Sequence, residues 1–493
     1  MSAADALFNT DGYKLGHIHM YPAKSQFVLS NFTPRTSRIE GVDKVVFFGL
    51  QHWLADTLGR QWGEFFAGDI DAIAAEYDDF LLNYLGPDNG VGSQQWRDLH
   101  ALGYLPLEFR ALPEGTAVPL RVPMFTVENT HPDFYWLVNY LETSMSNSLW
   151  MPCTSATIAK RMRDMLNKKA LASGMTVDDV AFGGHDFSMR GMSGLDAAET
   201  SGAAHLTSFT GSDSLPAIRF VKKFYPTDSF IGGGVPATEH AVMCAGGKDD
   251  EIETFRRLLH LYPKGILSVV SDTWDLWKVM TEILPALKDE IMAREGTLVI
   301  RPDSGDPSDI LMGDKNAEAG SPASKGVVNL LAEVFGTTEN AAGFKSLDSH
   351  VGAIYGDSIN YDRADDITDR LIEQGYVATQ VVLGMGSYGY QMNTRDTFGF
   401  AIKATNIVID GVETAIFKDP ITDNGTKKSL KGRIVVARNP MSRELEALDD
   451  ERAGLRKDVI ANGHNLLATV WRNGAFVKEY TFDEVRANVL ANA

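Results

Sequence analysis

A recurring pattern in the middle of the chain constrains its fold more than any other sequence feature. Short runs rich in Val, Ile and Leu end abruptly in a small or charged cluster, at 266–270, 297–300, 351–355, 381–383 and, less clearly, 180–182. Such runs, with helical stretches between them, indicate βα units and a parallel sheet. A β/α barrel carries its active site in the loops after its strands, but an open doubly wound sheet binds ligands at the same edge. The pattern predicts an α/β fold with a site at that edge and leaves both architectures open.

The two ends of the chain differ from the middle. Alternating apolar and polar residues predict strands at 26–32, 107–111, 118–122, 432–437, 468–471 and 476–480. We therefore expect a central irregular β/α barrel at 151–390 and a second, mostly β domain assembled from 1–150 and 391–493. A polar, breaker-rich stretch within 313–326 is most simply a surface insertion.

Charge and composition narrow the class of protein. The 493 residues carry a net charge of −19, whereas a nucleic-acid binder or a membrane-surface protein would favour a basic face. No apolar run approaches the roughly 18 residues of a membrane helix, and no signal peptide is visible. Two cysteines exclude a disulfide framework. We expect a cytoplasmic protein with no nucleic-acid or membrane partner, which must gather Lys and Arg locally to bind anionic substrates.

Three strand-end clusters could hold a sugar phosphate. Arg301 and Asp303 follow one strand, where a guanidinium suits phosphate and a carboxylate suits a sugar hydroxyl or Mg²⁺. Gly356 and Asp357 follow another strand. Glycine lets a ligand approach the backbone closely, and the carboxylate can accept hydrogen bonds from ribose hydroxyls. The glycine-rich segment 384–389 could surround a phosphate with N–H groups. Each cluster taken alone could be an ordinary turn. The position of all three at strand ends is what favours a binding site.

Other clusters supply an aromatic ring, a histidine and cations. Phe187 and Arg190 suit a flat heteroaromatic substrate, although a core Phe with an unrelated Arg is the plainer explanation. His240 stands beside Glu239, a pairing that is usually structural. Cations gather after the glycine-rich segment, at Arg395, Lys403, Lys418, Lys427 and Lys428.

Taken together, these segments resemble the nicotinamide phosphoribosyltransferases. Matching motifs stand in the family's order over nearly the whole chain and include TDGYK at 10–14, HDF at 185–187, GSD at 211–213, SVVSD at 268–272, RPDSG at 301–305, TRD at 394–396 and YTFDE at 480–484. The resemblance implies transfer of a phosphoribosyl group from phosphoribosyl pyrophosphate (PRPP) to nicotinamide, which gives nicotinamide mononucleotide and pyrophosphate in NAD salvage. It also implies Mg²⁺, ATP as co-substrate, and a homodimer in which the β domain contributes to the dimer and to shared active sites.

The resemblance assigns roles to individual residues. Phe187, and Tyr13 from a second subunit, would stack on the two faces of nicotinamide, whose carboxamide would bind Asp213. His240 matches the family's phosphorylated histidine, through which ATP hydrolysis favours product. The candidate catalytic residues are His240, Asp303, Arg301 and Asp213, and no metal ligand is assigned. The ribose and 5′-phosphate would contact Asp275, Arg301, Asp303, Gly356, Asp357, Gly384, Gly386, Ser387, Arg395 and Lys403. Pyrophosphate or ATP would contact Arg35, Arg190, His240, Ser271, Lys418 and Lys427.

Asp213 gives a physical reason to prefer the amide to the acid. A carboxylate gains a hydrogen bond from nicotinamide but meets a like charge in nicotinate, a difference on the order of 10²-fold in affinity. The alternatives are a nicotinate phosphoribosyltransferase and a non-catalytic binding protein on the same scaffold. A Rossmann-type NAD enzyme is disfavoured because no strand–GxGxxG–helix unit is present. Ser188, Met189 and Ala401 depart from the family pattern, which affects the expected substrate affinity more than the reaction type.

Overall fold

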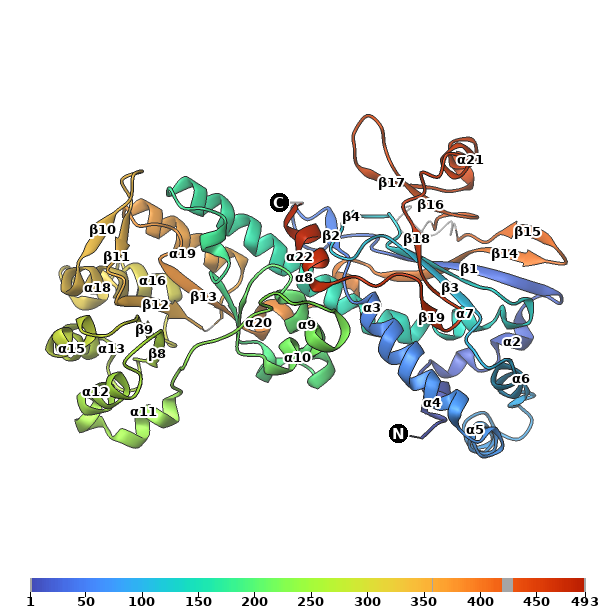
Figure 1. The fold of residues 1–493 in the computed structure, drawn as a ribbon, viewed down its shortest axis with the longest axis horizontal. Helices are drawn as coiled ribbons and strands as arrows, with labels where there is room; N and C mark the ends of the chain where they lie inside the picture. The colour runs from blue at the N-terminus through green and yellow to red at the C-terminus, as the bar shows by residue number, and fades with distance from the viewer. Residues whose placement is uncertain (1, 357, 419–428, 492–493) are drawn as a thin grey trace. The chain divides into compact units, whose positions relative to one another are not determined.

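The computed structural model describes residues 2–356, 358–418 and 429–491 (Figure 1). The chain forms two compact units. The first comprises residues 1–157, 221–228 and 393–492, as far as these are described, and the second comprises 158–220 and 229–392. The segment 221–228 lies inside the range expected for the barrel domain but groups with the first unit. None of the described helices combines the length and the apolar character that crossing a bilayer requires.

The second unit is built around a parallel sheet (Figure 1). Its strands are rich in Val, Ile and Leu, which suit positions buried on both faces, and every residue of the β8 strand is buried. Among the described residues this sheet has six strands, which in spatial order are β7 (Gly211–Ser212), β6 (Gly184–Asp186), β13 (Val381–Met385), β12 (Val351–Tyr355), β9 (Leu298–Arg301) and β8 (Leu267–Val270). All neighbouring pairs are parallel, so the carboxyl ends lie at one edge.

One irregular segment, 231–238, joins the two edge strands of this sheet. Gly233 forms a parallel bridge with Gly211 of β7, and Ala237 forms one with Ser268 of β8. Backbone hydrogen bonds of 2.9–3.0 Å flank both bridges. The parallel sheet is therefore a half-barrel whose circuit this segment completes, and the predicted α/β class with an irregular barrel is confirmed.

Helices of the second unit pack against the strands through one apolar core. Leu258, Leu330 and Ile367 share this core with Val269 and Ile300. The helices are α9 (Leu195–His205), α11 (His240–Gly246), α12 (Glu251–Leu261), α13 (Leu276–Lys278), α14 (Leu284–Ala286), α15 (Lys288–Met292), α16 (Pro307–Met312), α17 (Pro322–Lys325), α18 (Val327–Phe335), α19 (Tyr361–Glu373) and α20 (Ser387–Tyr390). Helices α8 (Glu142–Ala172) and α10 (Leu215–Phe224) contribute residues to both units.

Side-chain caps start the helices that follow the strand-end loops. Asp306 accepts the N–H groups of Ser308 and Asp309 at the start of α16, and Asn360 accepts that of Arg363 in α19. Each cap fixes the point at which a loop becomes a helix, and thereby limits the length of the loop that carries the candidate site.

The stretch 313–326 folds as a closed loop. Asp314 N–H donates to Ala323 O at 2.9 Å, and a Cβ added to Gly313 would lie 2.4 Å from Ser324 O. Gly313 and Gly326 have φ values of 100° and 81°, which glycine adopts at little cost. The two ends of the stretch therefore meet, and it can be accommodated without disturbing α16 and α18.

Two strand assignments made from the sequence are wrong. Residues 180–182 were expected to form a strand, but Asp178–Val180 is a helical turn and β6 begins at Gly184. The apolar run is buried at Val180, which explains the misleading signal. In the segment 476–480 only Phe476 is in a strand, because β19 is confined to Ala475–Phe476.

The first unit contains an antiparallel sheet assembled from both ends of the chain. In spatial order its strands are β15 (Val412–Ala415), β14 (Ala401–Ile409), β1 (Ser25–Thr33), β5 (Phe125–Asn129), β3 (Leu107–Ala111), β18 (Ala468–Arg472) and β19 (Ala475–Phe476). Separate two-stranded pairs are β2 (Lys44–Val46) with β4 (Ala117–Pro119) and β16 (Val435–Arg438) with β17 (Leu445–Leu448). The second unit has one such pair, β10 (Thr337–Glu339) with β11 (Lys345–Leu347).

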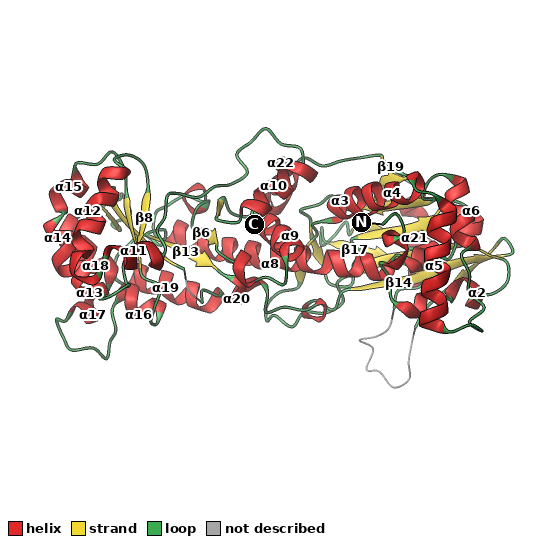
Figure 2. Ribbon diagram, turned by 90° about the horizontal axis from the view of Figure 1, so that it is seen from below, coloured by secondary structure: helices red, strands yellow, loops and turns green. Residues whose placement is uncertain are grey.

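The first unit also contains helices, several of which lie beside this sheet in Figure 2. They are α1 (Asp5–Phe8), α2 (His17–Met20), α3 (Leu50–Trp53), α4 (Trp62–Ala67), α5 (Ile70–Leu85), α6 (Gln94–Leu102), α7 (Leu137–Tyr140), α21 (Ala453–Ala461) and α22 (Phe482–Ala491). A π-helical stretch, Leu54–Gln61, connects α3 to α4.

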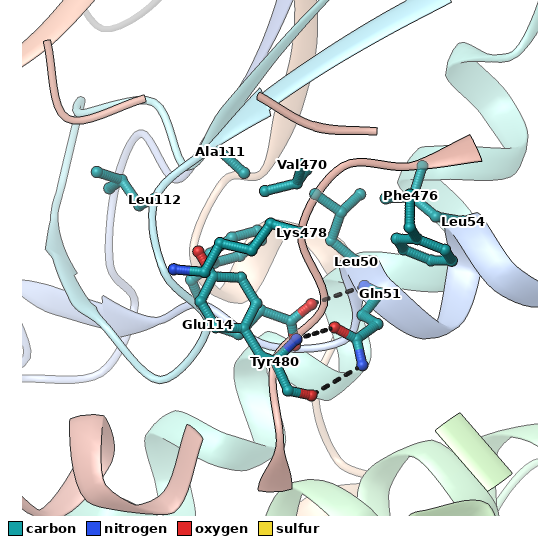
Figure 3. Close-up of a pocket in the computed structure, with 11 residues that line it drawn as sticks. Leu50, Gln51, Leu54, Ala111, Leu112, Glu114, Val470, Phe476, Lys478 and Tyr480 are labelled. Carbon is teal, nitrogen blue, oxygen red and sulfur yellow. Dashed lines mark hydrogen bonds between the residues drawn. The ribbon is translucent and has the colours of Figure 1, made fainter. Parts of the chain in front are cut away.

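A buried carboxylate ties distant segments of the first unit together (Figure 3). Glu114 accepts the N–H groups of Gly49 and Gln51, at 2.9 and 2.6 Å, and the hydroxyl of Tyr225 at 2.8 Å. Burial raises the pKa of Glu114 despite these donors. The side-chain amide of Gln51 in turn bonds to the backbone of Phe224 and Tyr480. These bonds account for the grouping of 221–228 with the first unit.

Candidate functional site

The ring of Phe187 lies against two glycines at the carboxyl edge of the parallel sheet. Phe187 follows β6, and its N–H donates to Met385 O of β13 at 3.0 Å. A Cβ added to Gly384 would lie 2.5 Å from Phe187 Cδ2, and one added to Gly356 would lie 3.2 Å from Cε2. Glycine at the ends of β13 and β12 therefore makes room for the ring, which is only partly buried.

Arg301, the last residue of β9, and Asp303, in the loop after that strand, lie beside this ring. The guanidinium carbon of Arg301 is 5.9 Å from the centroid of the Phe187 ring, and Arg301 Nη2 is 3.9 Å from Asp303 Oδ2. Arg301 Nε is buried and has no hydrogen-bond partner among the described residues. Asp303 Oδ1 would lie 3.2 Å from a Cβ at Gly356. The structure thus brings together a cation, a carboxylate, an aromatic face and two glycines that were singled out in the sequence.

A second carboxylate, Asp272 after β8, connects this group to His240. Asp272 Oδ1 is 3.1 Å from His240 Nε2, and Asp272 Oδ2 accepts from Asp303 N–H at 3.0 Å and from the Ser304 hydroxyl at 2.6 Å. The Asp272 side chain is only 6% exposed, whereas that of His240 is 48% exposed. Asp272 therefore holds both the imidazole at the start of α11 and the loop that carries Asp303.

A third carboxylate, Asp213 after β7, is paired with a histidine of β6. His185 Nε2 is 2.9 Å from Asp213 Oδ1. The side chain of His185 is 10% exposed and that of Asp213 is 49% exposed. The imidazole lies 4.7 Å from the Phe187 ring, measured between centroids. A carboxylate that is open to ligands is thus held next to the aromatic face.

The loop after β13 approaches the turn that contains Arg190. A Cβ added to Gly191 would lie 2.0 Å from Ser387 Oγ, so glycine is required for this approach. A Cβ added to Gly386 would meet no atom within 4 Å, which leaves the backbone of this loop open. Arg190 is exposed. The loop can therefore present backbone N–H groups and a hydroxyl to an anion.

Two residues predicted to contact the substrate bind the local backbone. Asp275 Oδ1 accepts the N–H groups of Trp277 and Lys278, at 3.0 and 3.1 Å, and so caps α13. The hydroxyl of Ser271 is buried and donates to Val269 O at 2.8 Å. Both side chains therefore stabilise the β8–α13 loop.

Tyr13, Arg35, Arg395 and Lys403 belong to the first unit. The Tyr13 ring is 63% exposed, and burial together with nearby Glu142 raises its pKa. Lys403 Nζ is 3.7 Å from Glu142 Oε1. Burial and neighbouring Arg395 lower the pKa of Arg35. An exposed aromatic ring is thus grouped with three cations in this unit.

The remaining predicted positions are less informative. Asp357 and Lys427 lie outside the described residues. Lys418 is exposed, and its backbone N–H donates to Ser429 Oγ at 2.8 Å. No group of three or more His, Cys, Asp or Glu side chains suited to a metal ion occurs in the part of the chain that the structure describes.

Comparison with known proteins identifies the family. The model of the nicotinate phosphoribosyltransferase (NAPRTase) family matches residues 182–465, more than half of the chain. The chain is 45% identical to the nicotinamide phosphoribosyltransferase of Acinetobacter baylyi over 97% of its own length and 95% of the relative's. The chain belongs to the nicotinate phosphoribosyltransferase family. A second relative, the nicotinamide phosphoribosyltransferase of Xanthomonas campestris pv. campestris, is 35% identical over 98% of this chain and 97% of the relative.

Solved structures agree with the fold of this phosphoribosyltransferase. The nicotinate-nucleotide pyrophosphorylase of Pyrococcus furiosus superimposes with a TM-score of 0.60 at 16% identity, over 99% of this chain and 95% of that one. Human nicotinic acid phosphoribosyltransferase superimposes with a TM-score of 0.54 at 14% identity, over 98% and 92%. At these identities the likeness supports the fold alone.

Two residues of this phosphoribosyltransferase were not among the candidates chosen from the sequence. Asp272 stands after β8 as Asp303 stands after β9, so its strand-end position was an available signal. His185 lies inside β6, and its pairing with Asp213 follows from the register of β6 with β7, in which His185 is opposite Gly211. That register cannot be seen in the sequence.

Proposed function

We propose that this chain is a nicotinamide phosphoribosyltransferase that makes nicotinamide mononucleotide and pyrophosphate from nicotinamide and PRPP, in NAD salvage. The observation that carries the proposal is the 45% identity, over nearly the whole of both chains, to a relative of that name. The side chains grouped at one edge of the sheet support the proposal. Phe187 can stack on a flat ring, Asp213 can bind a carboxamide, and Arg301 and Asp303 can bind a sugar phosphate.

The nicotinamide ring would stack on Phe187, and its carboxamide N–H would donate to Asp213. Asp213 is half exposed, with one oxygen held by His185, so the other remains available to a substrate. A carboxylate accepts hydrogen bonds only, and it repels the carboxylate of nicotinate. The geometry therefore favours the amide over the acid, and Asp213 is the residue that makes the distinction.

The phosphoribosyl group would lie between Asp303 and the 384–387 loop. The ribose hydroxyls would donate to Asp303, and the 5′-phosphate would bind the loop and Arg301. Mg²⁺ usually binds one or two carboxylates together with substrate phosphates, and Asp303 would supply a carboxylate for an ion that enters with PRPP. When bound, Mg²⁺ would neutralise charge on the departing pyrophosphate.

The transfer itself requires no general base. The lone pair of the pyridine nitrogen forms a bond to C1 of the ribose while the C1–oxygen bond to pyrophosphate breaks and its electrons leave with the pyrophosphate. Positive charge that develops on the ribose is stabilised by Asp303, and the geometry of attack is set by the Phe187 ring. Catalysis therefore consists of positioning and electrostatic stabilisation.

ATP would act through His240. Asp272 accepts a hydrogen bond from His240 Nε2. The imidazole proton is therefore on Nε2, and Nδ1 keeps a lone pair. Nδ1 would attack the γ-phosphorus of ATP with loss of ADP, and water would later release phosphate from the histidine. Because Asp272 also holds the N–H of Asp303, a change at His240 would be transmitted to the ribose-binding loop.

The active form would be a homodimer. Tyr13 is an exposed aromatic ring grouped with Arg395 and Lys403, which suits the second face of nicotinamide and the 5′-phosphate of PRPP. We propose that these residues come from the second copy of the chain. Arg35 and Lys418, and Lys427 outside the described residues, would then meet pyrophosphate or ATP.

One set of assays tests the proposal. Product formation is measured from PRPP and Mg²⁺ with nicotinamide or nicotinic acid, with and without ATP, for the wild type and for His240→Ala. We expect nicotinamide to be preferred, ATP to stimulate the wild type, and ATP to have no effect on His240→Ala. A preference for nicotinic acid would favour the nicotinate enzyme, and no product from either would favour a binding protein. If ATP does not stimulate the wild type, the role of His240 fails while the transferase proposal stands.

A further inference from the structure

The geometry points to His185 as a positioning residue that holds Asp213 for recognition of the carboxamide, and thereby sets the preference for amide over acid. This inference rests on the proposed function and concerns the same site. His185 does not itself need to touch the substrate, because it acts through the 2.9 Å contact between its Nε2 and Asp213 Oδ1.

The imidazole is confined on more than one side. His185 is opposite Gly211 in the β6–β7 pair, and a Cβ at Gly211 would lie 2.7 Å from His185 Nδ1. The Phe187 ring lies close to the imidazole as well, at 4.7 Å between centroids. The strand backbone carries the ring, so the position of Nε2 is fixed by the sheet rather than by a loop.

The Asp213 side chain, by contrast, has little else to hold it. Asp213 follows a two-residue strand, and its side chain is half exposed. Gly234, in the segment that completes the barrel, leaves room for it, because a Cβ there would lie 2.9 Å from Asp213 Oδ1. The only hydrogen bond recorded for the Asp213 carboxylate in the described residues is that from His185. Without it, the carboxylate is free to rotate into solvent.

The protonation pattern of the pair is determined by chemistry. An ionised carboxylate has no proton to donate, so His185 Nε2 must be the donor. One carboxylate oxygen is then occupied, and the second faces a ligand as an acceptor only. A neutral imidazole leaves the pair with one negative charge, which accepts the N–H of an amide and repels an acid. The orientation and the charge of Asp213 together produce the selectivity.

Two variants of His185 separate positioning from packing. His185→Phe keeps an aromatic ring in the confined space but removes the donor, and His185→Gln restores a side-chain N–H. For each variant, kcat and KM are measured with nicotinamide and with nicotinic acid, alongside thermal unfolding. We expect His185→Phe to raise the KM for nicotinamide about tenfold or more, the usual effect of losing a hydrogen bond to a charged group. The KM for PRPP should stay within about twofold of the wild type, because the change in binding is confined to the amide.

The ratio of kcat/KM for the two substrates decides the outcome. The ratio should fall at least about tenfold in His185→Phe and recover in part in His185→Gln, and His185→Phe should cause no further fall in an Asp213→Ser background. An unchanged ratio in a folded His185→Phe, or an equal loss of kcat with both substrates, would overturn the inference. If His185→Phe does not fold, an unchanged ratio in His185→Asn, whose shorter amide cannot reach Asp213, would do so. A wild type that does not use nicotinamide would instead overturn the proposed function.

Discussion

Glycines 384 and 356 determine where the Phe187 ring can lie, and the first prediction concerns them. In Gly384→Ala the new Cβ would be 2.5 Å from Phe187 Cδ2 and 2.6 Å from Gly356 Cα, so the ring or the strand must shift. We expect the KM for nicotinamide to rise about tenfold or more, because the displaced ring can no longer stack on the substrate or position it correctly. Steady-state kinetics would test this. The matched control is Gly352→Ala on β12, where the Cβ would make ordinary contacts at 3.6 and 3.7 Å; equal effects of both variants would contradict the explanation.

Asp272 is the side chain that should orient His240 for the proposed ATP-dependent step. Asp272→Asn keeps the shape but can no longer act as a charged acceptor for both His240 and the Asp303 loop. We expect ATP hydrolysis to fall at least about tenfold, because a histidine nucleophile loses both its fixed tautomer and the charge that stabilises its cation. Glu239→Gln is the control, since in the described residues the Glu239 carboxylate accepts no hydrogen bond from His240. ATPase activity lost in Glu239→Gln but kept in Asp272→Asn would assign the orienting role to Glu239 instead.

The irregular segment 231–238 replaces a regular strand in the barrel, so its side chains must do part of the hydrogen bonding. Thr238 Oγ1 accepts the N–H of Val270 at 2.9 Å, and both residues are buried. Thr238→Val keeps the shape and leaves that N–H without a partner, which costs about 1–3 kcal/mol. We expect a lower thermal midpoint and faster hydrogen exchange at the Val270 amide, whereas Thr238→Ser, which keeps the hydroxyl, should protect the amide. Equal exchange in the two variants would show that the hydroxyl does not stabilise the closure.

The elements that could be predicted from the sequence are those with a strong local signal. Strands β8, β9, β12 and β13 are buried apolar runs followed by polar clusters, and each was predicted within a residue or two. Strand β6, Gly184–Asp186, has no such run, and the nearby apolar residues at 180–182 misled the prediction. The segment 231–238 could not have been recognised at all, because it forms single bridges to two strands that are distant in sequence.

At the level of the whole molecule, the sequence predicts where the candidate site lies but not which of its side chains pair with one another. The carboxyl ends of parallel strands lie at one edge of a sheet. Arg301, Gly356 and Gly384 could therefore be expected together from their positions at strand ends. The pairs His185–Asp213 and His240–Asp272 join residues 28 and 32 positions apart, and they depend on strand register and on the paths of loops. Local patterns carry no information about strand register or loop paths, so these two pairings emerged only from the structure.

The assembly of the first unit from separate segments predicts how its stability should respond to pH. His52, in α3, packs edge-on against Phe224 of the segment 221–228, with ring centroids 4.5 Å apart. Burial, opposed by nearby Asp56 and reinforced by Lys223, lowers the pKa of His52 from 6.5 to about 4. The unfolded chain therefore binds a proton at His52 at a higher pH than the folded chain does. The stabilising contribution is complete above pH 6.5 and is lost as the pH falls towards 4, by up to about 3 kcal/mol.

Replacing His52 by a residue that does not titrate isolates this contribution. His52→Phe keeps an aromatic contact with Phe224, so its urea denaturation midpoint should decline less between pH 6.5 and pH 4 than that of the wild type. His464→Gln, at an exposed position of the same unit, serves as the control and should follow the wild type. Parallel curves for His52→Phe and the wild type over this range would show that the packing of α3 on 221–228 does not depend on a neutral His52. A smaller decline in His52→Phe alone would show that acid loosens the first unit at the point where its middle segment joins the rest.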